Sequence, residues 1–261
     1  MILKRLNHTA LDSARKESGR QAETIRRFRT KVDAISTGHP KLVDHHLLAA
    51  AARALNKGAR KTAGRLVSFG LRNRSRKIFE QTSPFVGRES MLLDLGSGDG
   101  KVGEMFAKKH GCRVTLMDVM NYNKTSLPFH KYNGRETRFI DDQFEHVLLV
   151  TVLHHSDDPI AVMSEALRVA SRSVVVIESV YFNEMHRVFN SFFDWFYNRV
   201  LNDPNVNVPL NFLPPKAWVS LFGELGGRTT HMEHFGIDMP VVPEWHTLYV
   251  VEKNKIGPGG I

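Results

Sequence analysis

The sequence predicts an α/β fold, a doubly wound and mostly parallel sheet that follows a basic helical extension. Two observations lead to it. From residue 90 onward, short apolar runs alternate with amphipathic segments, which is the order of strands and helices in such sheets. A glycine-rich turn joins the first apolar run to the first amphipathic segment. The hydrophobic fraction of 42% is sufficient for the core of a sheet of this kind.

Residues 1–88 are expected to form the extension or lid, because apolar residues recur there at helical spacing. Residues 1–90 carry 20 Lys and Arg against 7 Asp and Glu, whereas residues 91–261 carry 16 against 20. Such asymmetry favours an anionic partner for the extension, either nucleic acid, a membrane surface or an acidic substrate. A solubilising helical face explains the charge equally well.

The chain has one cysteine, Cys112, which excludes an intramolecular disulfide and suits a reducing compartment. No apolar segment follows Lys4 and Arg5 as a secretory signal requires, and the longest apolar runs are far shorter than the ~20 residues of a membrane span. We expect a cytoplasmic protein, with peripheral attachment to a membrane as an open alternative.

The second domain, residues 89–261, is predicted element by element. Apolar runs predict strands at 91–95, 113–118, 146–153, 173–178 and 246–252. Helical spacing predicts helices at 101–110 and 159–170. Right-handed crossovers between parallel strands would then bring the carboxyl ends of these strands to one edge of the sheet.

The glycine-rich turn at residues 94–100 reads D-L-G-S-G-D-G. Dinucleotide sites require G-x-G-x-x-G, but here the third glycine comes one position early and Lys101 stands in its place. Asp94 and Asp99 would repel a pyrophosphate and attract a cationic ligand. Asp118, at the end of the second strand, is suited to accept hydrogen bonds from both hydroxyls of a ribose.

Residues 91 to about 180 resemble the class I S-adenosylmethionine (SAM)-dependent methyltransferases of the small-molecule type. The resemblance lies in the turn at 94–100, the strand ending at Asp118, the segment F-E-H-V-L-L with V-L-H-H and D-D-P at 144–159, and the last strand at 245–251. It implies a seven-stranded Rossmann-like sheet with an antiparallel closing strand, and SAM as cofactor.

The resemblance also implies the residues that bind the cofactor. They are Asp94, Gly96, Ser97, Gly98, Gly100, Asp118, Val119, Asn133 and Val152. Asn133 stands where the family often has an acid that contacts the adenine amine, and its amide oxygen can accept one hydrogen bond there. Asp141 and Asp142 are the rival candidates.

Three titratable residues are candidates for catalysis. His154 and His155 end the fourth predicted strand and Glu178 ends the fifth, so all three are expected beside the transferred methyl group. One of them could act as a general base, or the group could only shape the pocket. We expect no metal site, because His231, His234 and His246 lack the number and spacing of zinc ligands.

The segment 181–222 carries 11 of the chain's 24 Phe, Tyr and Trp residues. It is interpreted as an aromatic cap insertion whose side chains form a core face, an apolar acceptor pocket, or both. We therefore predict methyl transfer to a small, apolar or lipid-like acceptor. The alternatives are an RNA methyltransferase that uses the basic helices and a SAM-binding partner protein without turnover.

Overall fold

The computed structural model describes residues 30, 73–196, 198, 209–236 and 245–254. The chain divides into two compact units, Met1–Leu42 and Val43–Ile261, and every described residue except Thr30 belongs to the second unit. The helices predicted in the first 72 residues therefore lie outside the described residues. No helix in the described part of the chain is long and apolar enough to cross a membrane.

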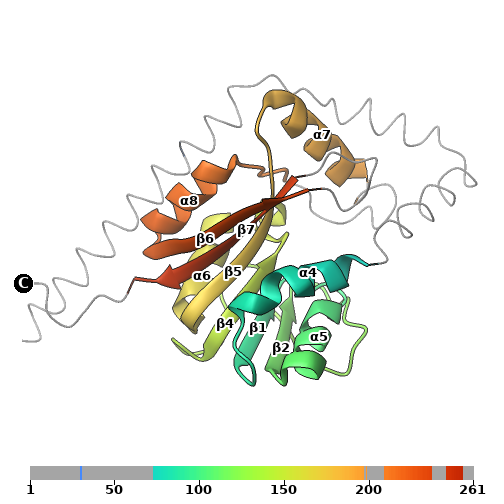
Figure 1. The fold of residues 1–261 in the computed structure, drawn as a ribbon, viewed down its shortest axis with the longest axis vertical. Coiled ribbons are helices and arrows are strands. Elements are labelled where there is room, and N and C mark those ends of the chain that lie inside the picture. Colours follow the sequence, from blue (N-terminus) through green and yellow to red (C-terminus); the bar gives the residue numbers. More distant parts are fainter. Residues whose placement is uncertain (1–29, 31–72, 197, 199–208, 237–244, 255–261) are drawn as a thin grey trace, which may run out of the picture. The chain divides into compact units, whose positions relative to one another are not determined.

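A seven-stranded sheet in the order β3-β2-β1-β4-β5-β7-β6 forms the centre of the second unit (Figure 1). The first five strands in this order are parallel, and β7 is antiparallel to both neighbours. The predicted fold class is thus confirmed. The strands are β1 (Met91–Leu95), β2 (Arg113–Asp118), β3 (Phe129–Lys131), β4 (Phe144–Val150), β5 (Ala170–Val180), β6 (Gly227–Phe235) and β7 (Trp245–Lys253).

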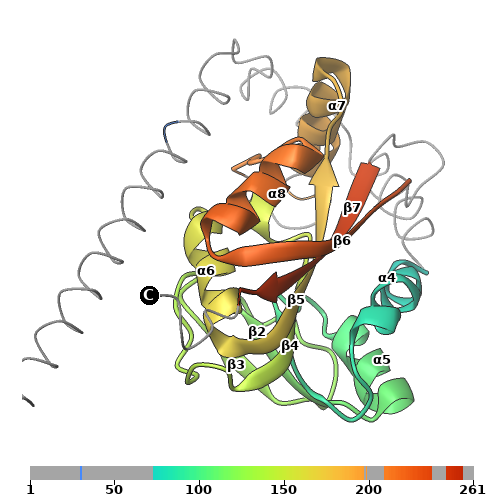
Figure 2. The same cartoon turned by 60° about the vertical axis from the view of Figure 1, so that its left-hand side comes forward.

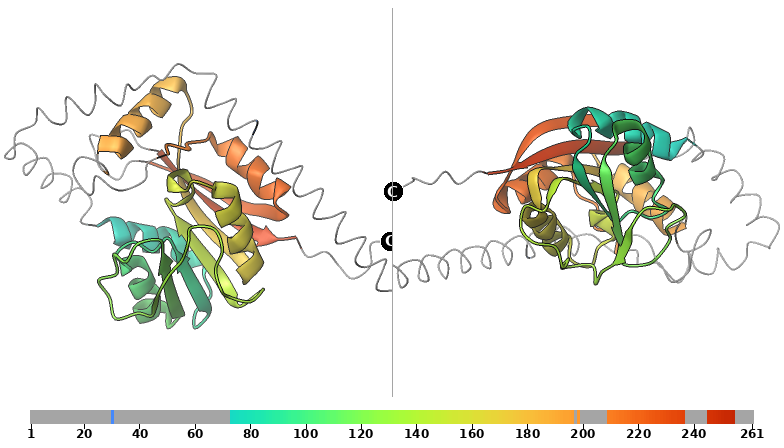
Figure 3. Two further views of the ribbon diagram at one scale, coloured as in Figure 1. Left: turned by 180° about the vertical axis from the view of Figure 1, so that it is seen from behind. Right: turned by 90° about the horizontal axis from the view of Figure 1, so that it is seen from below.

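Helices cover both faces of the sheet (Figure 2). On one face lie α4 (Arg74–Thr82), followed by the 3₁₀ turn η1 (Ser83–Phe85), and α5 (Lys101–His110); on the other lie α6 (Pro159–Val169) and α8 (Pro215–Glu224). The helix α7 (Glu184–Trp195) lies beyond the carboxyl end of β5 (Figure 3). It lies within residues 181–222, the segment that we interpreted as a cap insertion.

The helix α4 belongs to the core although its sequence lies in the basic extension. Ile78 and Phe79 are buried, and the Phe79 ring meets that of Phe106 in α5 edge to face at 4.9 Å. Such aromatic pairs stabilise a core beyond the area they bury. The end of the extension therefore packs as part of the α/β unit, while the domain boundary near residue 88 stays a prediction.

The fourth strand ends three residues earlier than predicted, at Val150. Thr151 has a φ of 54°, its N–H donates to the carbonyl of Ile177 at 2.7 Å, and the 3₁₀ turn η2 (Leu153–His155) follows. A left-handed conformation is strained for a β-branched residue, and such strain gathers at functional sites. The apolar residues of this segment predicted a strand to residue 153, because an apolar run does not reveal a turn within it.

Two strands were not predicted separately. β3 has only three residues, and β6 is a polar edge strand in which few side chains are buried. Neither has the apolar run that marks a strand buried on both faces.

Candidate active site

The carboxyl ends of β1, β2, β4 and β5 meet at one edge of the sheet, where ligands bind in open α/β folds. The glycine turn after β1 and the turn η2 after β4 lie against each other there. A Cβ atom on Gly96 would lie 2.4 Å from Val152 Cγ2, far inside van der Waals contact. Gly96 also has a φ of +79°, so glycine is required both for the turn and for this close approach.

Backbone amides of the glycine turn are tied to the end of β2. The N–H groups of Gly96 and Ser97 donate to the carbonyl of Met117 at 2.7 and 3.1 Å. The Gly98 N–H donates to Asp118 Oδ2 at 2.9 Å, and the Met120 N–H donates to Oδ1 at 3.3 Å. Each carboxylate oxygen has a second lone pair, so Asp118 can still accept bonds from a ribose.

Two further groups on the turn fit a cationic ligand. Asp94 is buried, and that burial raises the pKa of its carboxyl to about 7, with the charges of Asp118 and Asp99 adding to the effect. A bound cation would offset this unfavourable burial of negative charge. The Ser97 hydroxyl oxygen is also buried and has no hydrogen-bond partner among the described residues. The residues present therefore fit SAM, which carries a sulfonium and an ammonium group.

Asn133, the residue predicted to contact the adenine amine, already uses its side-chain oxygen within the protein. Asn133 Oδ1 accepts from the backbone N–H groups of Arg135 and Glu136, both at 2.9 Å. Its oxygen thus stabilises its own turn, although the prediction needed it as an acceptor for the ligand. Val119, which is largely exposed, lies beside this turn, because a Cβ on Gly134 would be 3.3 Å from Val119 Cγ1.

The rival acids form ion pairs elsewhere. Asp141 accepts from Arg168 at 2.6 Å and Asp142 from Lys253 at 2.5 Å. Among these candidates for the adenine contact, it is the turn at Asn133 that lies beside the loop after β2.

The three predicted catalytic candidates come together around a buried carboxyl. Glu178 is fully buried in β5, and Oε1 accepts from the N–H groups of Val152 and Leu153 at 3.0 and 2.7 Å. Its Oε2 lies 2.5 Å from Nδ1 of His154. Burial raises the pKa of Glu178 to about 7. Because the carboxyl accepts at this contact, the proton of His154 is assigned to Nδ1, and Nε2 carries the lone pair.

The second histidine is paired with a residue of the cap. His155 Nε2 lies 3.3 Å from Oδ1 of Asp194, near the end of α7. The rings of His154 and His155 are 4.2 Å apart, and Phe212 stacks on His154 at 4.9 Å. Sequence reasoning missed Asp194. Its one signal in the sequence is that it is the single acid in residues 192–197, where all the remaining residues are aromatic.

His231, His234 and His246 do not meet. His231 lies 3.4 Å from Glu233, His234 lies 2.8 Å from the Thr247 hydroxyl, and His246 stacks on Phe235. In the described residues these three histidines therefore form no common site.

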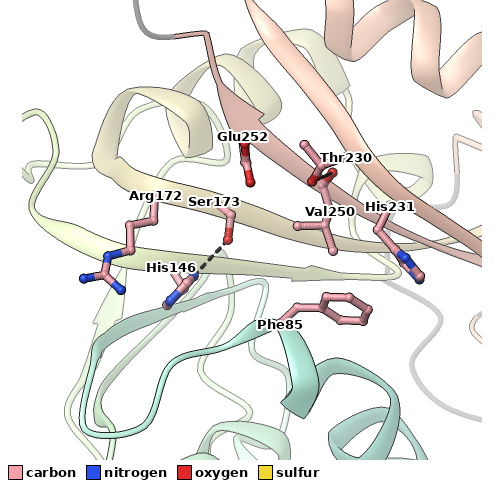
Figure 4. Close-up of a pocket in the computed structure, with 8 residues that line it drawn as sticks. All are labelled: Phe85, His146, Arg172, Ser173, Thr230, His231, Val250 and Glu252. Atoms are coloured by element: carbon pink, nitrogen blue, oxygen red, sulfur yellow. Dashed lines mark hydrogen bonds between the residues drawn. The ribbon is translucent and has the colours of Figure 1, made fainter.

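A separate pocket of about 450 Å³ opens near the amino-terminal ends of β4 and β5 (Figure 4). Its residues are Phe85, His146, Arg172, Ser173, Thr230, His231, Val250 and Glu252. His146 is held there by Ser173 at 2.8 Å and by the Gly87 N–H at 3.2 Å. The pocket lies near the edge opposite to the glycine turn, so it is not part of the cofactor site.

Comparison with known proteins agrees with this geometry. Residues 93–177 match the family model described as a methyltransferase domain. The uncharacterized protein MJ1123 of Methanocaldococcus jannaschii is 25% identical over 134 residues, which span 51% of this chain and 62% of that protein. The match thus covers less than two thirds of that relative's length.

Solved structures share the fold at low identity. A SAM-dependent methyltransferase from Aquifex aeolicus has a TM-score of 0.50 and 13% identity over 76% of this chain and 98% of its own. A chain from the Haloferax volcanii complex between the Trm112 methyltransferase activator and a candidate methyltransferase has a TM-score of 0.54 and 13% identity over 75% and 98%. Residues 93–177 thus belong to a methyltransferase domain with the class I, Rossmann-like fold, and SAM is the cofactor that such a domain implies.

Proposed function

We propose that this methyltransferase domain is active and transfers the methyl group of SAM to a small, apolar or lipid-like acceptor. The observation that carries the proposal is the contact between Gly96 and Val152, because it joins the cofactor turn to the turn that holds His154 and His155. SAM supplies a methyl group already activated by a positive sulfur. The task left to the chain is to align the acceptor, which can contribute ~7–11 kcal/mol.

The reaction itself is a displacement. A nucleophilic atom of the acceptor forms a bond to the methyl carbon while the carbon–sulfur bond breaks and its electron pair stays on sulfur. A proton on the acceptor, where there is one, passes to a base or to solvent. His154 and His155, with Glu178 holding His154, are proposed to contact the reacting group.

Apolar side chains near α7 support the choice of acceptor. Met185 and Phe189 lie four residues apart in α7, so they share one face of the helix, and they are 64% and 40% exposed. Phe182, just before the helix, is 49% exposed. Exposed apolar groups that lie together mark binding surfaces for apolar ligands or membranes. The basic extension, residues 1–88, would then hold the protein at an anionic membrane surface. Each well-placed Lys or Arg would contribute ~1 kcal/mol to the free energy of membrane binding.

The test is transfer of radiolabelled methyl from SAM into a host lysate, which is then separated into lipid, RNA, protein and small-molecule fractions. We expect label in the lipid or small-molecule fraction, and its loss in Asp118→Ala. Label in RNA would reject the acceptor class and favour the RNA alternative. Absence of label despite SAM binding would reject turnover.

The apolar surface can be tested with a matched pair of variants. Met185→Ser should lower transfer to an apolar acceptor several-fold by raising its KM. Met232→Ser is the control, because Met232 is 44% exposed but lies on the edge strand β6. Equal effects of the two substitutions would reject α7 as the acceptor surface.

A further inference from the structure

We propose that His154, His155 and Asp194 bind a divalent transition-metal ion of the Zn²⁺ type and leave a coordination position for an oxygen atom of the acceptor. The ion site follows from the described side chains alone. Only the identity of its last ligand rests on the proposed function. The proposal departs from the expectation of no metal site, which rested on the number and spacing of His231, His234 and His246.

The three side chains are close enough to share one ion. One potential ligand atom from each lies within 4.8 Å of the other two, and the His155–Asp194 pair is at 3.3 Å. Bonds of ~2.0–2.1 Å from Zn²⁺ to nitrogen and oxygen place tetrahedral ligand atoms roughly 3.4 Å apart. The His155–Asp194 pair already has that separation, and a ligand nitrogen of His154 lies within 4.8 Å of both.

Glu178 prepares His154 for this role. A histidine that binds a metal through one nitrogen usually donates its other N–H to a carboxylate or carbonyl, which fixes the ring and its tautomer. Glu178 Oε2 holds Nδ1 of His154 at 2.5 Å and is itself fixed by the Val152 and Leu153 amides. Nε2 of His154 is therefore the nitrogen that we assign to the ion.

The donor set also indicates which ion fits. Two imidazoles and one carboxylate suit Zn²⁺ or Fe²⁺, whereas Mg²⁺ and Ca²⁺ prefer oxygen ligands alone. Three protein ligands with an open position are typical of catalytic rather than structural zinc sites.

The three proposed ligands differ in how far their side chains are buried, and an ion that both the protein and an acceptor contact requires such a difference. The side chains of His154 and Asp194 are 2% and 7% exposed, whereas that of His155 is 27% exposed. The ion would thus be held from the protein side and reached from the acceptor side. A cation there lowers the pKa of a hydroxyl that coordinates it, so the acceptor class becomes an apolar molecule with a hydroxyl or phenol group.

The experiment is a titration of metal-free full-length protein with Co²⁺, followed by competition with Zn²⁺. The visible absorption of Co²⁺ intensifies when its coordination changes from octahedral to tetrahedral. We expect one equivalent to bind and Zn²⁺ to displace it. His155→Gln and Asp194→Asn should each weaken binding at least 100-fold. Glu178→Gln should weaken it ~10–100-fold, as loss of a ligand's supporting carboxylate does.

His231→Gln is the matched control, because His231 also lies beside a carboxylate, that of Glu233, but outside the site. It should bind Co²⁺ as the unchanged protein does. Binding of SAM by each variant shows that the fold is intact. No bound equivalent, equal binding by all variants, or loss in His231→Gln as well would overturn the proposal. Failure of the unchanged protein to bind SAM would instead reject the proposed function and leave the metal result standing.

Discussion

The two halves of the active-site edge are built in different ways. The cofactor half, between β1 and β2, consists mainly of backbone, with glycines at positive φ and amides that bond to Met117 and Asp118. The acceptor half, between β4, β5 and α7, consists of buried titratable side chains that are far apart in the sequence. The first half should therefore be sensitive to added side-chain atoms at Gly96, whereas the second should be sensitive to the identity of its charged groups.

The largest effect is expected in the cofactor half, from Gly96→Ala. Its new Cβ would meet Val152 at 2.4 Å, and its φ of +79° is unfavourable for alanine. We expect SAM binding to weaken at least 100-fold, as measured by calorimetry. Adding Val152→Ala should restore part of the affinity, since it removes the Cγ atoms and leaves only Val152 Cβ at 3.3 Å.

Gly223→Ala is the control for that substitution. A Cβ at Gly223 would meet nothing within 4 Å, and this glycine has no positive φ. It should leave SAM binding unchanged. If Gly96→Ala binds SAM equally well, the cofactor half is not built on this close approach.

A smaller effect, confined to turnover, is expected in the acceptor half from Glu178→Gln. A neutral amide is a weaker acceptor for the His154 N–H and the two backbone amides that Glu178 now fixes. We expect kcat to fall ~10–100-fold, while the Kd for SAM changes less than about threefold. Glu233→Gln, on the exposed edge strand, is the control and should change neither. A parallel loss of SAM affinity would show that the two halves are not separable.

The smallest effect concerns the pH dependence of stability in the protein without ligand. Burial raises the pKa of Asp94 from its ordinary value of 3.8 to about 7. The folded state therefore holds this proton where the unfolded state has lost it, so stability is lost as pH rises from about 4 to 7. The slope due to this one group is at most ~1.4 kcal/mol per pH unit.

Asp94→Asn should flatten that slope in denaturant unfolding measured from pH 4 to 8. Asp99→Asn, on the same turn, should keep most of it, because burial is the largest cause of the raised pKa of Asp94 and the charge of Asp99 is a smaller one. SAM should stabilise the unchanged protein more at pH 8 than at pH 5, since the ionised carboxyl favours a cation. An identical slope in Asp94→Asn would contradict the assignment.

The sequence predicted the strands, turn and helix of the cofactor half for a physical reason. A strand, a sharp glycine turn and a helix are local features, and residues 91–118 contain them in order. The positions of Gly96, Gly98 and Asp118 follow once the two strands are known to be parallel neighbours. The carboxyl end of β4 was less predictable, because the turn at Thr151 is stabilised by β5 and not by its neighbours in sequence.

By itself, then, the sequence determined the fold class and the cofactor, and it predicted the edge of the sheet at which the ligand is expected. Only the tertiary structure decided that Glu178 would hold His154, that Asp194 would approach His155, and that α4 would join the core. These contacts join residues 24, 39 and 27 positions apart. No local pattern encodes such pairs, because each depends on strand order and on how a helix packs against the finished sheet.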